Sequence, residues 1–139
     1  MGFGCLVVNG CGSDFSPDYE IPSPSGSYVA LLGSRTRFLK QNHHLRILRE
    51  GQIVLDAEIW FDRIESGIAD ARWSSDGSEF AVKVCGDGVK FVTIFDVSTG
   101  RTETLQGAEL SRVPAWTGFD DSCIFGYRLD AYRVSAKSS

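Results

Sequence analysis

Histidine, the side chain best suited to act as a general base near neutral pH, occurs only at His43 and His44. A nucleophilic serine needs such a base beside it, so a hydrolase would have to use one of these two. No serine lies in a G-x-S-x-G elbow. The polar run around the pair predicts an exposed loop between strands. The sequence therefore favours a non-enzymatic protein without catalytic residues, and a hydrolase is the lesser alternative.

Metal ligands are also sparse. Adjacent residues of a strand face opposite sides, so His43 and His44 are poorly placed to hold one ion. Asp120-Asp121 has no further oxygen ligand at calcium-loop spacing, and we expect a solvated turn there. No two cysteines have the C-x-x-C spacing of zinc sites. The sequence predicts no metal site and no cofactor.

Elements that would position any site are indicated by an internal repeat. Trp73–Val82 (WSSDGSEFAV) predicts strand, turn and strand, with Asp76-Gly77 forming the turn. Pro22–Leu31 (PSPSGSYVAL) has the same form. Further on, Leu45–Gly51 matches Val92–Gly100, and each segment ends in a glycine turn before another strand. A third, degenerate copy begins at Pro114 and predicts a final strand over 127–134.

This pattern resembles the repeats of WD40-like and TolB-type β-propellers. The resemblance implies an all-β fold of antiparallel sheets, with repeats at 21–55, 71–105 and, in part, 114–135. Residues 1–20 are expected to be a flexible segment, and 21–139 a single domain. Closed propellers have about four to eight blades. We therefore favour a sandwich-like sheet pair, with half of a propeller completed by a second copy and docking on a larger protein as alternatives.

The cysteines carry two further hypotheses. Gly10-Cys11 resembles a bacterial lipobox, which implies lipidation at Cys11, a membrane anchor and a cell-envelope location; a disordered or edge-strand N-terminus in a cytoplasmic protein is the alternative. Cys85 and Cys123 lie at matching places in successive repeats. They would form a disulfide in an oxidising compartment if their strands are neighbours. Two small buried core residues are the alternative.

Charge limits the partners. The formal net charge is −4, which argues against nucleic acid, since phosphate binding needs a basic face. Basic residues gather in 35–49, and acidic residues outnumber basic ones in 50–79. Two solvated faces that partly neutralise each other are favoured over a polarised surface that steers a charged partner.

The remaining candidates suit protein recognition, because aromatic residues and arginine are enriched at interface hot spots. We predict a protein-binding role, for example as a small bacterial protein that neutralises a toxin or an enzyme, with self-association left open. A carbohydrate or small-ligand module using Trp60 and Trp116 is the alternative. The predicted partner-binding residues are Trp60, Phe61, Trp116, Phe119, Arg35 and Arg37.

Overall fold

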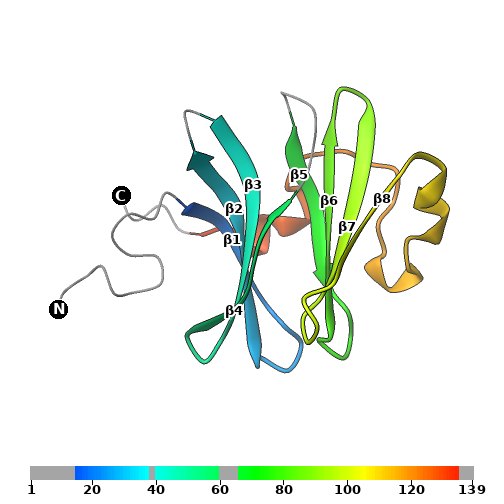
Figure 1. Cartoon of the computed structure of the whole chain (residues 1–139). Coiled ribbons are helices and arrows are strands. Elements are labelled where there is room, and N and C mark those ends of the chain that lie inside the picture. Colours follow the sequence, from blue (N-terminus) through cyan, green and yellow to red (C-terminus); the bar gives the residue numbers. More distant parts are fainter. Residues whose placement is uncertain (1–14, 38–39, 60–65, 135–139) are drawn as a thin grey trace.

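The computed structural model describes residues 15–37, 40–59 and 66–134, which form two four-stranded antiparallel sheets (Figure 1). In each sheet, neighbouring strands follow one another along the chain. Sheet A contains β1 (Phe15–Pro22), β2 (Tyr28–Arg37), β3 (Lys40–Arg49) and β4 (Gln52–Ile59). Sheet B contains β5 (Gly67–Trp73), β6 (Glu79–Gly86), β7 (Val89–Asp96) and β8 (Thr102–Gln106). The predicted all-β, antiparallel fold class is confirmed.

The first repeat is longer than predicted. Strand β1 begins at Phe15, inside the segment expected to be flexible, and β4 continues to Ile59. His43 and His44 lie within β3 rather than in a loop, so that expectation was wrong. Their polar neighbours suggested an exposed loop, but the strand pairs with β2 along its whole length, and His44 is buried beside the fully buried Leu45.

Equivalent turns open both repeats. The hydroxyl Oγ of Ser23 accepts from the backbone N–H of Tyr28 at 3.1 Å, and that of Ser74 accepts from Glu79 at 3.0 Å. In both turns the glycine N–H, from Gly26 or Gly77, donates to the carbonyl of that serine. Both glycines have a positive φ, which side chains rarely adopt. The predicted strand–turn–strand pattern therefore has the same local chemistry in both sheets.

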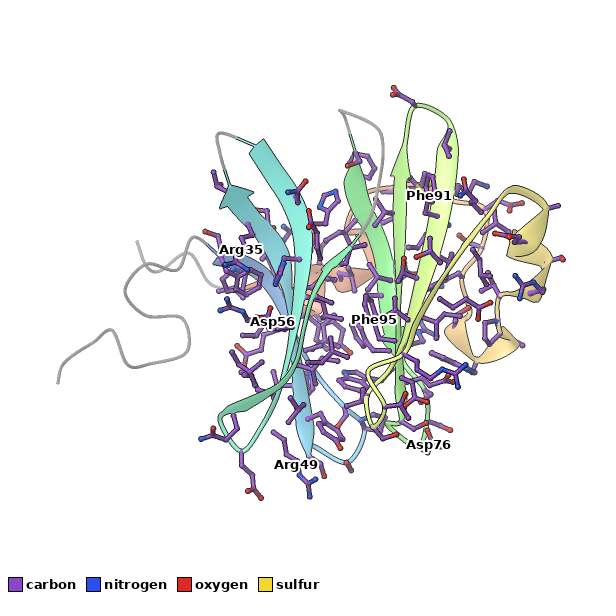
Figure 2. The ribbon with its side chains drawn as sticks, viewed as in Figure 1. Arg35, Arg49, Asp56, Asp76, Phe91 and Phe95 are labelled. Atoms are coloured by element: carbon purple, nitrogen blue, oxygen red, sulfur yellow. A yellow bond between two sulfur atoms is a disulfide. The ribbon has the colours of Figure 1, made fainter. Side chains whose placement is uncertain are left out.

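A single hydrophobic core lies between the two sheets, with Phe95 labelled inside it (Figure 2). Ala30 and Leu32 face it from sheet A, and Phe80 and Val82 face it from sheet B. The contact also includes polar and aromatic links. The indole Nε1 of Trp73 in β5 donates to the carbonyl of Ile21 in β1 at 2.9 Å, and its ring stacks on Tyr28.

Side chains at equivalent positions point in the same direction in both sheets. Ala30 faces sheet B, whereas its equivalent Ala81 lies on the face of sheet B that points away from sheet A. The same holds for three further pairs, which are Leu45 and Val92, Ile47 and Ile94, and Leu55 and Leu105. The inner face of sheet A therefore corresponds to the outer face of sheet B. Conversely, the outer face of sheet A corresponds to the inner face of sheet B.

Residues 107–134 form a C-terminal strap that covers the outer face of sheet B and then returns to sheet A (Figure 1). Its regular parts are three short 3₁₀ helices, η2 (Gly107–Arg112), η3 (Ala115–Thr117) and η4 (Tyr127–Tyr132). Gly126 donates its N–H to the carbonyl of Ile68 at 2.9 Å, and Leu129 is buried in the core between the sheets. Val134 ends the strap by donating to the carbonyl of Asp18 in β1 at 2.8 Å.

The predicted strand over 127–134 was therefore wrong. Most of this segment is η4, and only Arg133 makes an isolated bridge to Tyr19. Apolar and polar residues alternate over 127–131, which is the pattern of a strand, but the chain enters a 3₁₀ helix after Gly126, whose φ is 67°, and Leu129 is buried in the core. The apolar residues after Pro114 therefore do not form a third sheet. Instead they fill the outer face of sheet B and part of the central core.

Candidate interaction surfaces

The outer face of sheet A carries an apolar group that no described element covers. Four half-buried or exposed aliphatic residues from β2, β3 and β4 form it, and Val54 is the most exposed at 44%. Val29 lies directly opposite Leu48 in the ladder between β2 and β3. We call this group the sheet A patch: Val29, Leu31, Leu48 and Val54.

The equivalent side chains in sheet B are buried. Val29 corresponds to Phe80, Leu31 to Val82 and Leu48 to Phe95. All three sheet B residues are fully buried against sheet A. The sheet A patch therefore occupies the positions through which the second repeat packs on a neighbouring sheet.

Beside the patch lies a polar network that joins β3 to β4. The Nε2 atom of His44 is 2.5 Å from Oδ1 of Asp56, and the Nε of Arg46 is 3.3 Å from the same oxygen. Phe15 lies 4.8 Å below the guanidinium and 5.4 Å from the imidazole, edge on. Burial would raise the pKa of Asp56, but the hydrogen bond from His44 and the charges of His44 and Arg46 lower it.

These contacts settle how the two charge blocks meet in sheet A. Because β3 pairs with β4, the basic block lies beside the first part of the acidic block, and Arg46 pairs directly with Asp56.

Arg35 lies on the outer face, opposite Phe15 in the ladder (Figure 2). Arg37 belongs to β2. Trp60 and Phe61 lie outside the described residues.

The outer face of sheet B is covered instead. Trp116 and Phe119 pack from the strap against Val92, Ile94 and other apolar residues of this face. Both are half-buried in this contact, so their rings are only partly available to a partner. Asp120 and Asp121 are exposed, as expected of a solvated turn.

Farther along the strap, Cys123 forms a disulfide with Cys85 of β6, with their Cα atoms 5.9 Å apart. Cys123 lies in a loop rather than at a matching place in a third sheet. Lys83, two residues before Cys85, is 2% exposed, and its ammonium donates to the carbonyls of Asp120 and Ser122. Burial lowers the pKa of Lys83, and the nearby carboxylate of Asp120 partly opposes this effect.

One serine–histidine pair bridges the ends of the sheets. The Nε2 of His43, on the inner face of sheet A, is 2.8 Å from the Oγ of Ser66 just before β5. Burial lowers the pKa of His43, and the charge of Asp18 works in the opposite direction. Burial also raises the pKa of Asp18. A neutral imidazole in this position is able to accept the proton of the Ser66 hydroxyl.

The remaining predictions concern lipidation, metal binding and the membrane. Cys11 lies outside the described residues. Within the described ranges, no group of three or more His, Cys, Asp or Glu side chains is placed to hold a metal ion. The same part of the chain has no helix long and apolar enough to cross a membrane.

Sequence reasoning missed Leu31, Val54, Ser66 and Lys83. Leu31 and Val54 looked like ordinary strand residues, and their importance depends on which face each sheet leaves uncovered. The lysine did carry a signal, because it interrupts an apolar run over 80–85 that predicts a buried strand.

Comparison with known proteins gives no family for this chain: no protein-family model, curated protein or solved structure matches it.

Proposed function

We propose that this chain is a non-enzymatic recognition module that binds a protein partner through the sheet A patch. The observation that carries the proposal is the unequal burial of equivalent positions. Phe80, Val82 and Phe95 are fully buried against a neighbouring sheet, whereas Val29, Leu31 and Leu48 remain partly exposed. A partner with an aliphatic surface would complete the same packing.

The chemistry around the patch favours a protein partner. Inside the molecule, the face that meets Phe80 and Val82 is aliphatic and comes from a sheet. The neighbouring His44–Asp56–Arg46 network adds polar groups in fixed positions, which suit the polar rim of a protein interface. Equivalent side chains of the two sheets point in the same direction, as they do in successive blades of a propeller, where each face meets another sheet. This arrangement also supports the proposed likeness to propeller blades.

An oxidising compartment fits this role. The Cys85–Cys123 disulfide supports such a location, because disulfides are rare in reducing cytosol. This favours the cell-envelope alternative over the cytoplasmic one.

The test is affinity capture of the tagged chain from its source cells, read by mass spectrometry. Leu31→Asp and Val54→Asp place a charge in the patch and should abolish capture of a stoichiometric partner. Val89→Asp, at the half-exposed tip of the β6–β7 hairpin, is the matched control and should capture normally. Equal capture by all variants would overturn the proposal. Light scattering of the purified chain would identify a second copy as the occupant.

A serine hydrolase is the second candidate, favoured by the 2.8 Å contact between His43 and Ser66. A fluorophosphonate probe would label Ser66 in the wild type, and His43→Ala should lower labelling at least about a hundredfold if the imidazole acts as a general base. Absence of label on the wild-type protein would remove this candidate.

A further inference from the structure

The Cys85–Cys123 disulfide has one buried and one exposed end. Cys85 is 2% exposed in β6, on the face that the strap covers, whereas Cys123 is exposed in the strap. Disulfide exchange requires a thiolate to reach one of the two sulfurs. An external thiol therefore meets the Cys123 side of the bond first.

A buried lysine, Lys83, lies on the same strand as the buried end of the disulfide. Lys83 and Cys85 are two residues apart in β6, so both side chains point to the outer face of sheet B. The Lys83 ammonium contacts the carbonyl of Ser122, the residue that precedes Cys123. A neighbouring lysine favours the thiolate form of a cysteine, and a thiolate of lower basicity is the better leaving group.

We propose that Cys123 is a thiol-exchange site, at which a small external thiolate attacks Sγ and releases Cys85. The new bond joins the external sulfur to Sγ of Cys123. The bond between Cys123 and Cys85 breaks, and its electron pair goes to Sγ of Cys85, which becomes a thiolate on the same face of β6 as Lys83. A second external thiolate then attacks the external sulfur. It yields the disulfide of the small thiol and a Cys123 thiolate, so two external thiols are oxidised as one protein disulfide is reduced.

Exchange would free one part of the strap. The segment on either side of Cys123 keeps the Lys83 contacts, the ion pair between Lys90 and Asp121, the close approach of the Phe125 ring to Gly67, and one backbone bond from Gly126 to Ile68. Trp116 and Phe119 remain packed on the outer face of sheet B. Opening should therefore be confined to 120–125, on the side of the molecule remote from the sheet A patch. The inference does not depend on the proposed partner.

The first experiment treats the full 139-residue chain with graded reduced glutathione, in a Cys5→Ser, Cys11→Ser background. Free thiols are trapped with N-ethylmaleimide and mapped by peptide mass spectrometry. We expect glutathione on Cys123 and N-ethylmaleimide on Cys85, with faster amide hydrogen exchange in 120–125 and no change in sheet A. Glutathione mainly on Cys85, or reaction only after urea unfolds the protein, would overturn the proposal.

The second experiment tests Lys83 as a positioning residue. Lys83→Met should slow the exchange about three- to tenfold, because the leaving thiolate loses its cation. Lys83→Arg, which keeps the charge, should restore most of the rate. Arg101→Met is the matched control, since Arg101 is an exposed cation just before β8. Lys90 is unsuitable, because it lies opposite Cys85 in the ladder between β6 and β7. Faster exchange in Lys83→Met would show that the lysine merely holds the strap, and would refute its role. If Lys83→Met does not fold, the mapping in the wild-type chain still decides the site.

Discussion

Sheets A and B are built from the same repeat, yet they protect their outer faces in different ways. Sheet B is covered by a separate segment, the C-terminal strap. Sheet A places charged or polar residues where sheet B has apolar or neutral ones: His44 corresponds to Phe91 and Arg46 to Thr93. In repeat architectures the terminal units need outer faces that tolerate water. The comparison shows two solutions to that requirement within one short chain.

The difference also has a functional side. The strap is a separate segment that could detach from sheet B and expose the face beneath it. The polar residues on the outer face of sheet A are part of its strands and cannot detach. Sheet A keeps an apolar area, the sheet A patch, beside its polar network, and this area is the part of the face that still resembles a packing surface.

The largest expected effect comes from paired truncations at equivalent positions of the two repeats. Phe95→Ala should lower the free energy of unfolding by about 3–5 kcal/mol, because it removes a fully buried ring between the sheets. Leu48→Ala, at the corresponding place in sheet A, should cost about 1 kcal/mol, because that side chain is only half-buried. Urea unfolding measures both. Equal costs would mean that the two faces are buried to the same degree in solution.

A smaller effect tests the polar network of sheet A. Asp56→Asn should cost about 1 kcal/mol at pH 7, with allowance for solvent screening of a carboxylate whose side chain is 39% exposed. The pKa of Asp56 is lowered in the folded state, so its stabilisation is present above about pH 4. It is lost as the pH falls through the folded pKa.

Urea midpoints between pH 7 and pH 2 would measure this, with Glu58→Gln as the control on the same strand and face. A wild-type acid profile in Asp56→Asn would contradict the assignment.

The smallest effect compares the two opening turns. The Asp76 carboxylate accepts from the Ser74 and Ser78 hydroxyls and from the Ser78 N–H, which lower its pKa to about 2. Ser25, at the same place in sheet A, makes its side-chain hydrogen bonds among the described residues with Ser27. Asp76→Ala should lower the urea midpoint more than Ser25→Ala does.

Acid should then weaken this difference. The Asp76 contribution is present above about pH 4 and is lost as the pH falls toward 2, because its pKa is depressed on folding. Ser25→Ala should keep the wild-type pH dependence. A pH-independent gap between the two variants would show that the carboxylate charge is irrelevant to the turn.

Much of the sheet structure could be predicted from sequence, because turns and alternation are local. Ser74, Asp76 and Gly77 specify the turn within a few residues, and both strands beside it alternate or are apolar. The hairpin turn at Asp87-Gly88 was also predictable, and both residues have a positive φ. Strand ends were harder to predict. The polar residues before Leu45 suggested a loop, but they belong to β3.

The candidate sites depended on long-range packing instead. The strap residues that pack on sheet B recur every three positions, but Pro114 and Gly118 interrupt any regular helix, so only the folded chain shows that Trp116 covers sheet B. Likewise, Leu31 and Val82 occupy equivalent places in the sequence pattern. Val82 is buried and Leu31 is partly exposed because sheet B packs through this face and sheet A packs through its opposite face. The partner of Cys85 could be considered from sequence, but its separation from Cys123 could not.

The hydrogen bond from Val134 to Asp18 brings the last described residue of the strap to the first strand of the chain. The path of the polypeptide is thereby closed into a ring, with both described ends at one edge of sheet A. Such a closure makes the domain a natural candidate for circular permutation. New termini at the exposed Gly51 turn, with the old ones joined by a flexible linker, would keep the meander of sheet B whole and would place β4 ahead of sheet B in the sequence, separate from β1–β3. The order in which the strands of sheet A are assembled would then be under experimental control.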